Sequence, residues 1–140
     1  MNYWLVKSEP NVWSFDQQVA KGAAGEVWTG VRNHSAKLHL MAMKKGDRAF
    51  FYHSNVGMEI VGIAEVVREH YHDPTADEGT PWVVVDIAAK EPLPRPVSLA
   101  EIKAEPRLKE MALVKYGRLS VQPVTAEEWK IVCEMGGLGG

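Results

Sequence analysis

Three short polar clusters hold the residue types that could do chemistry in this chain. They are Lys-Ser-Glu-Pro at 7–10, Trp-Thr-Gly-Val-Arg-Asn at 28–33 and Tyr-His-Ser at 52–54. Each lies at or just beyond an apolar, strand-like run, and loops at strand ends on a rigid scaffold carry most binding chemistry. Brought together, the clusters would form a concave site with an indole, an amide, hydroxyl groups and an imidazole. This set suits a flat ring with a polar edge, such as a nucleobase.

Four side chains of these clusters are candidates for holding a base. Trp28 offers an indole face, and stacking of a base on an aromatic ring is worth about 1–3 kcal/mol. The Asn33 amide can donate and accept on one edge of a base, while Ser8 and His53 offer a hydroxyl and an imidazole. Each of the first three also has a structural alternative. Trp28 can be an ordinary core residue, Asn33 can cap a helix, and Ser8 can bond within its own turn.

Basic side chains near the clusters are candidates for phosphate contacts. Arg32 can present two parallel donors to a phosphate, and Lys7 and Lys37 offer ammonium groups. An ion pair with an acid such as Glu9 is the structural alternative for Arg32. A solvated lysine is the ordinary alternative for Lys7.

Two other functions fit parts of the same set. Ser8 and His53 could act as a hydrolytic dyad on a base or a small metabolite, but a Ser–His pair also needs an orienting acid and an oxyanion hole. Ser54 directly follows His53, so on a strand one side chain points to the pocket and the other to the scaffold. His-Tyr-His-Asp at 70–73 is too small and too local to specify zinc, so we expect neither a metal nor a cofactor. The remaining alternative is a protein-interaction module that captures a peptide or a small ligand.

Length and composition favour one domain without a membrane segment. The 140 residues are 46% hydrophobic, which is enough for one core, and the net charge of −2 argues against a general polyanion binder. Five basic residues lie in 30–48 and eight acids in 59–91, which predicts either a basic and an acidic end or two ordinary solvated faces. Cys133 is the only cysteine, which excludes a disulfide framework within one chain. Without a signal peptide or a membrane-length apolar run, a cytoplasmic protein is expected.

The hydrophobic pattern predicts five to seven strands with short helices between them. Strands are expected at 3–6, 26–28, 48–54, 59–69, 82–88 and 119–124. Helices are expected to follow the caps Ser14, Asn33, Ser98 and Thr125, and a shorter helix or turn at 108–114. The remaining segments are expected to form a hairpin turn at 55–57, a long loop at 71–81, an extended proline connector at 92–96 and a frayed tail at 136–140. The pattern as a whole predicts an α+β fold with a curled mixed sheet or a small barrel.

Several uncommon strings resemble the EVE domain family in order and spacing. They are YWLVKSEP at 3–10, WTGVRN at 28–33 followed by Ala36, MKKGD at 43–47, FYHS at 51–54, VGIAE at 61–65 and RLSV at 118–121. The resemblance covers essentially the whole chain. This family belongs to the PUA-like superfamily and is akin to YTH domains, which read N6-methyladenine in RNA.

The resemblance implies a single PUA-like domain over 1–140, built as a pseudo-barrel of about five or six mixed strands flanked by short helices. It implies a non-enzymatic reader that captures a modified cytosine or adenine from single-stranded or flipped-base DNA or RNA. It also brings Arg118, Leu119 and Ser120 to the pocket, with Leu119 as an apolar floor and Arg118 near a phosphate. A fused or associated nuclease or modification system is compatible with this role, and the sequence does not specify the oligomeric state.

Overall fold

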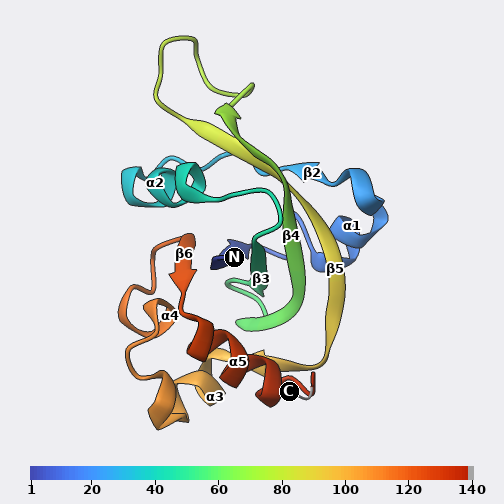
Figure 1. Ribbon diagram of the computed structural model, residues 1–140, viewed down its shortest axis with the longest axis vertical. Coiled ribbons are helices and arrows are strands. Elements are labelled where there is room, and N and C mark those ends of the chain that lie inside the picture. The colour runs from blue at the N-terminus through green and yellow to red at the C-terminus, as the bar shows by residue number, and fades with distance from the viewer. Residues whose placement is uncertain (139–140) are drawn as a thin grey trace.

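The computed structural model describes residues 1–138 and contains one mixed sheet of six strands with helices on both faces (Figure 1). The strands are β1 (Tyr3–Ser8), β2 (Glu26–Val27), β3 (Arg48–His53), β4 (Glu59–His72), β5 (Val83–Ser98) and β6 (Val121–Val124). The helices are α1 (Phe15–Ala20), α2 (His34–Ala42), α3 (Leu99–Ala104), α4 (Ala112–Lys115) and α5 (Ala126–Met135), with 3-10 turns η1 (Gly22–Ala24) and η2 (Pro106–Leu108).

The strand order is β2–β5–β4–β3–β1–β6. The β1 and β3 strands are parallel, and the other neighbours are antiparallel. The predicted α+β class with a mixed sheet is therefore confirmed. The sheet does not close into a barrel, because β2 and β6 are its two edges and do not pair with each other within residues 1–138.

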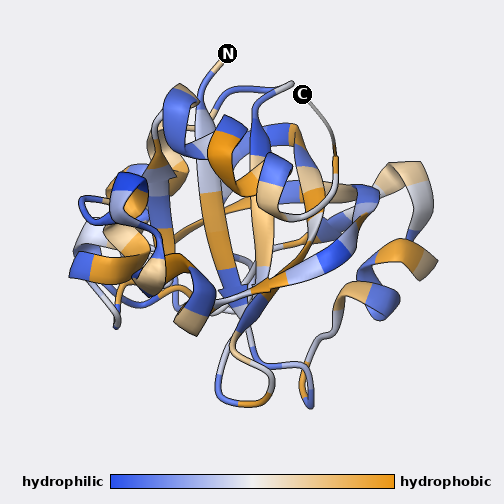
Figure 2. Ribbon diagram, turned by 90° about the horizontal axis from the view of Figure 1, so that it is seen from below, coloured by the Kyte–Doolittle hydropathy of each residue, from blue (hydrophilic) through white to orange (hydrophobic). Residues whose placement is uncertain are grey.

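The alternation of side chains along the central strands divides the core into two clusters, one on each face of the sheet. On β1, Trp4 and Val6 point to one face and Leu5 points to the other. Phe51 and Phe50 of β3 divide in the same way. The first cluster packs against α1 and α2, and the second packs against α3, α4 and α5. Figure 2 shows the resulting hydrophobic stretches on the strands in the middle of the molecule.

The helix starts and the hairpin follow from local sequence, as predicted. Ser14, Ser98 and Thr125 each form a complete capping box. The Asn33 side chain accepts a hydrogen bond from the backbone N–H three residues along the chain. The β3 and β4 strands pair antiparallel across the predicted hairpin, where Asn55 has a φ of 65°. Asparagine tolerates this left-handed conformation better than most residues.

β5 is much longer than predicted, because it continues through the prolines at 92–96. It pairs with β4 as far as Ser98, with several shifts of register. On its other side, β2 pairs with it at Asp86 and Ile87. The second half of β5 therefore has an edge without a strand neighbour among residues 1–138, and such an edge tolerates residues that lack an N–H. The prediction that 92–96 forms a proline connector separate from the strand is therefore wrong.

The same edge of β5 holds the segment 136–138. Arg95 N donates to Gly136 O at 3.0 Å, and Arg95 Nη2 donates to Met135 O at 2.8 Å. The start of the predicted frayed tail is therefore in contact with the sheet in this structure, and the fraying itself stays a prediction. The last two residues of that predicted tail, 139–140, lie outside the described residues.

Ion pairs join the basic segment 30–48 to the acidic segment 59–91. Arg48 Nε lies 3.5 Å from Glu65 Oε1, and Lys90 Nζ lies 3.6 Å from the other oxygen of the same carboxylate. Arg32 Nη1 lies 2.9 Å from Asp73 Oδ2. Two of the five basic residues in 30–48 are thus paired with acids of 59–91.

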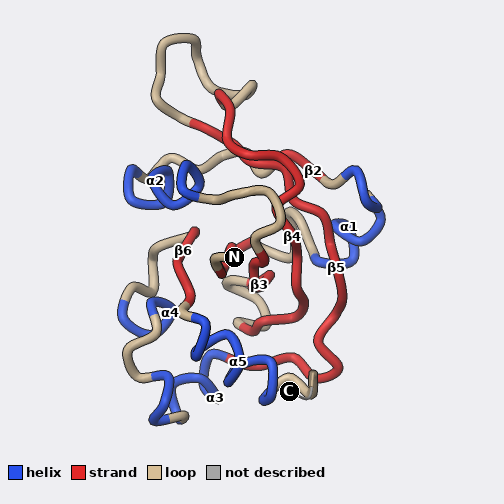
Figure 3. Tube along the Cα trace, in the orientation of Figure 1, coloured by secondary structure: helices blue, strands red, loops and turns tan. Residues whose placement is uncertain are grey.

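The connection between β4 and β5 extends away from the sheet as a long loop (Figure 3). Its base is closed by a hydrogen bond from Asp73 N to Trp82 O at 3.0 Å. Thr75 donates to Asp73 Oδ1 through both its backbone N and its hydroxyl, at 2.7 and 2.6 Å. A long loop is confirmed here, although it begins at Asp73 and not at Tyr71, because β4 continues to His72. Asp73 is fully buried.

The start of α1 is attached closely to the sheet. The Phe15 ring covers Gly62 of β4, where a Cβ would collide with the ring. Phe15 also meets Phe51 edge-on, with ring centroids 5.3 Å apart. Its backbone N donates to His53 Nε2 at 3.1 Å. Within residues 1–138, no helix combines the length and the apolar character that crossing a membrane requires.

Candidate functional site

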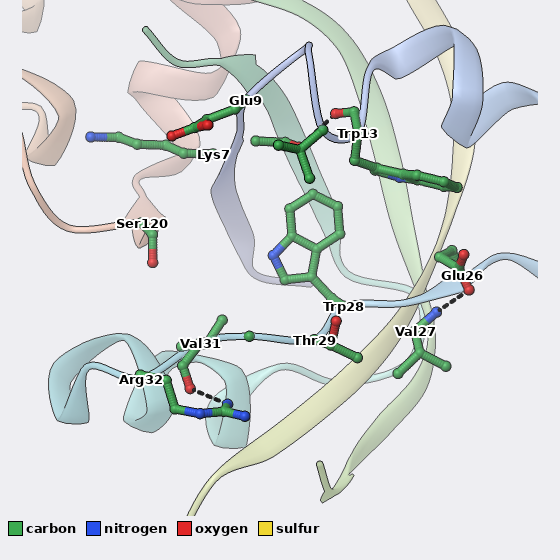
Figure 4. Close-up of a pocket in the computed structure, with 13 residues that line it drawn as sticks. Lys7, Glu9, Trp13, Glu26, Val27, Trp28, Thr29, Val31, Arg32 and Ser120 are labelled. Carbon is green, nitrogen blue, oxygen red and sulfur yellow. Dashed lines mark hydrogen bonds between the residues drawn. The ribbon is translucent and has the colours of Figure 1, made fainter. Parts of the chain in front are cut away.

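A cavity of about 420 Å³ opens where the end of β1 meets the segment that follows β2 (Figure 4). β1 and the loop after it contribute Lys7, Ser8, Glu9, Val12 and Trp13. The segment 26–32 forms a second side, and Ser120 lies across the cavity from it. The volume lies in the range of about 300–1,000 Å³ that is usual for small-ligand sites.

Two indoles belong to the cavity lining. Trp28 lies in the middle of the lining in Figure 4, and its ring meets Phe51 edge-on with centroids 5.6 Å apart. It is only 8% exposed, so it is a core residue that also lines the cavity. Trp13 is half-buried and donates through Nε1 to Gln18 Oε1 at 2.9 Å. Gln18 in turn donates to Ile87 O on β5, so the second indole has a defined orientation.

A buried carboxylate from the β4–β5 loop holds the wall that contains Trp28. Asp73 Oδ2 accepts from Gly30 N at 3.2 Å and from Arg32 Nη1 at 2.9 Å. Burial alone would raise the pKa of Asp73, but hydrogen bonds from Thr75, Arg32 and Gly30 lower that pKa to about 2. Arg32 therefore forms an ion pair within the protein, which was the alternative to a phosphate contact, although its partner is Asp73 and not Glu9.

The structure brings Ser8 to the cavity but not His53 or Ser54. Ser8 Oγ donates to Trp13 O at 2.5 Å, which is the turn bond of its structural alternative, and the same oxygen can still accept. His53 Nε2 accepts from Phe15 N, and burial lowers the pKa of this imidazole. Ser54 N donates to Ser8 O at 2.9 Å. Since the nitrogen that would take a serine proton is occupied, Ser8 and His53 are not arranged as a hydrolytic dyad.

Other predicted residues lie beside the cavity and not in it. Asn33, Arg118 and Leu119 line a second, more open depression of about 370 Å³. The two hollows are adjacent, because the consecutive residues Leu119 and Ser120 line one each. Asn33 also has its structural role, since its Oδ1 caps α2. Lys37 is half-buried on α2 and lines neither hollow.

The cavity has two cations and two carboxylates in its lining, and both cations are engaged. Lys7 Nζ donates to Gly117 O at 2.7 Å, and burial lowers the pKa of this ammonium. Arg32 is held by its buried acid partner. Glu9 and Glu26 are the carboxylates, and they too have partners: Asn55 Nδ2 donates to Glu9 Oε1 at 2.6 Å, and Lys21 Nζ lies 3.5 Å from Glu26 Oε2. Because carboxylates repel anions and accept hydrogen bonds, this lining suits an uncharged ring with an amino group better than a phosphate.

Sequence analysis did not assign several residues of this site, among them Trp13, Glu26 and Asp73. Trp13 was detectable in principle, because it is an aromatic residue just beyond the first polar cluster. Glu26 gave no signal that separates it from any other surface acid. Asp73 could not be assigned, because its partners Gly30 and Arg32 are more than forty positions away.

An indole-lined cavity at the strand ends of a mixed sheet defines a ligand-binding domain, and comparison with known families gives its identity. Residues 2–135 match the EVE domain family. The chain belongs to this family, as its sequence motifs predict.

Relatives of the chain agree with this assignment. Rat thymocyte nuclear protein 1 is 36% identical over 165 aligned positions, which cover 96% of this chain and 73% of that protein. A Rhodopseudomonas palustris protein solved by NMR is 73% identical, with a TM-score of 0.93 and coverage of 99% of this chain and 94% of that one. Human THYN1, solved in complex with DNA that contains 5-methylcytosine, is 34% identical, with a TM-score of 0.89 over 97% of this chain and 98% of that one.

The predicted kinship with YTH domains holds at the level of the fold. The YTH domain of a Zygosaccharomyces rouxii protein, solved with N6-methyladenosine RNA, has a TM-score of 0.59 to this chain over 96% of its length. Its sequence is 15% identical, so the likeness concerns the fold alone.

Proposed function

We propose that this protein is a non-enzymatic reader that takes one modified base, flipped out of DNA, into the cavity beside Trp13 and Trp28. The observation that carries the proposal is the cavity itself, which has the size of a small-ligand site, two indoles and a polar edge. The complex of human THYN1 with 5-methylcytosine DNA supports a methylated cytosine as the first candidate. The expected cytoplasmic location stays a prediction.

The lining offers a partner for each part of such a base. An indole can stack on the ring, for about 1–3 kcal/mol. The carboxylates of Glu9 and Glu26 keep lone pairs beyond their bonds to Asn55, Lys21 and Val27 N, so they can also accept from the exocyclic amino group that cytosine and adenine carry and that thymine and uracil lack. A methyl group on the ring can contact Val12 or Val31, which also line the cavity. The proposal therefore ranks methylated cytosine above thymine, although both carry a 5-methyl group.

Charge explains why a base and not the backbone carries the recognition. The net charge is −2, and the cations in the cavity lining already have partners within the protein. Flipping a base costs a few kcal/mol and is least costly in unpaired strands. We therefore expect binding to single strands with a shallow dependence on salt and little affinity for unmodified nucleic acid.

A panel of short single strands tests the proposal. Each strand carries one plain or methylated cytosine or adenine, as DNA or RNA, and the thermal shift of the protein is measured with each. The 5-methylcytosine DNA strand should stabilise the native protein and the Val56→Ala variant, whose change lies in the exposed β3–β4 turn. It should stabilise Trp13→Ala much less, and Trp13→Phe to an intermediate degree.

Each contrary outcome removes a defined part of the proposal. Stabilisation by a methyladenine RNA strand alone would overturn the choice of DNA and cytosine. Equal shifts in the native protein and in Trp13→Ala would exclude Trp13 as a contact of the base. If no strand shifts the unfolding temperature, the reader function fails, and metabolites and peptides become the ligands to test.

A further inference from the structure

The depression beside the cavity lies between α2 and the connection from α4 to β6. Figure 1 shows these elements on the same side of the molecule. Its lining residues are Asn33, Ser35, His39, Tyr116, Arg118 and Leu119. The depression is adjacent to the cavity. A nucleic-acid strand whose base occupies the cavity therefore either passes over the depression or leaves on the opposite side.

Tyr116 is the large aromatic side chain that this depression exposes to solvent. Tyr116 is 57% exposed, so much of the side chain is open to solvent. Its backbone is nevertheless firmly held. The fully buried Gln122 donates through Nε2 to both Tyr116 O and Leu119 O, at 3.0 and 2.9 Å. Lys7 Nζ donates to Gly117 O in the same turn. The turn thus presents a ring from a rigid support, which is what a stacking surface needs.

Arg118 is an exposed cation in the lining of this depression. Within residues 1–138 it forms no ion pair, whereas Arg32 on the cavity side is bonded to Asp73. An exposed guanidinium next to an exposed aromatic ring can bind a phosphate while a base stacks on the ring.

We propose that the depression is a second nucleotide subsite, in which the base next to the flipped one stacks on Tyr116 and a backbone phosphate contacts Arg118. This inference rests on the proposed function of the cavity. It makes the protein a reader of two consecutive nucleotides, the first chosen by its modification and the second by its stacking. Large bases therefore bind better than small ones in the second position.

Isothermal titration with matched ligands tests the subsite. The ligands are 5-methyl-2′-deoxycytidine monophosphate and dinucleotides in which its neighbour, on the 5′ or the 3′ side, carries adenine or no base. One adenine dinucleotide should bind about tenfold more tightly than its abasic counterpart, which corresponds to about 1.4 kcal/mol. This gain should vanish in Tyr116→Ala and persist in Tyr116→Phe. All three proteins should bind the mononucleotide equally, and their unfolding temperatures should agree, because the side chain is exposed.

Three outcomes would overturn the inference, and one of them also overturns the proposed function. An adenine gain that survives in Tyr116→Ala excludes this ring as the stacking surface. Binding of the mononucleotide without any gain from a neighbouring base removes the subsite but leaves the reader function intact. If the native protein binds none of these ligands, both proposals fail. As a further check, Arg118→Gln should reduce the salt slope for a longer single strand that carries the 5-methylcytosine by about 0.7.

Discussion

Replacing Asp73 by asparagine tests whether one buried carboxylate holds the wall of the cavity. Its pKa is about 2 instead of the ordinary 3.8, and each unit of such a difference corresponds to about 1.4 kcal/mol. The ionised carboxylate therefore adds about 2–3 kcal/mol to the free energy of unfolding at neutral pH. Since the pKa is lowered in the folded state, this contribution is complete above the unfolded pKa, near 4, and is lost as the pH falls toward 2.

Urea denaturation at several pH values measures this contribution. Asp73→Asn should lose about 2–3 kcal/mol at pH 7, and the difference from the native protein should be about half as large at pH 3. Asp77→Asn, on the exposed part of the same loop, is the matched control and should change stability by less than about 0.5 kcal/mol. Because Asp73 also orients Gly30 and Arg32, the variant should bind the 5-methylcytosine strand more weakly. A loss below about 1 kcal/mol, or a loss that is the same at pH 3 and pH 7, would refute the reasoning.

Three further predictions follow from contacts elsewhere in the fold. Gly62→Ala should lower the free energy of unfolding by about 1–3 kcal/mol, because the new methyl group meets the Phe15 ring; a thermal melt unchanged within error would contradict this packing. The pKa of His53 lies below its ordinary 6.5, so its neutral form stabilises the fold above that pH, and this stability is lost as the pH falls through the lower folded-state pKa. Relative to His53→Gln, which keeps an acceptor and does not titrate, the native protein should lose stability between pH 7 and pH 5. Burial raises the pKa of Cys133 to about 11, so iodoacetamide at pH 8 should alkylate it at least about tenfold more slowly than glutathione, and urea should remove the difference.

Features that depend on neighbouring residues could be predicted from the sequence. The capping boxes at Ser14, Ser98 and Thr125 bond over three positions, so four residues contain all the information. The hairpin after β3 is similar, because its turn residues determine its geometry. The extent of β5 could not be predicted, since a proline is compatible with a strand only at an edge, and the edge is defined by which strands lie beside it.

The same distinction applies to the candidate site. Ser8 and Trp28 line the cavity because the strand ends that carry them converge, as the position of the motifs predicts, and Ser120 joins them as the family resemblance implies. The orientation of His53 could not be read from the sequence, since its direction depends on the N–H of Phe15, thirty-eight positions earlier in the chain. Asn33 was ambiguous for a different reason. A single amide suits both a base and a helix cap, and here it acts as the cap.

The position of β1 in the sheet has a consequence for how the protein is made. β1 lies between β3 and β6, and its neighbour β6 is formed by residues 121–124. Contacts between strands so distant in sequence close large loops, which slows folding relative to helical proteins of the same size. During synthesis, β1 emerges from the ribosome long before β6 does. The edge of β1 that pairs with β6 therefore stays unpaired until nearly the whole chain has been translated. We expect chaperone binding or aggregation of the nascent protein to begin at this strand.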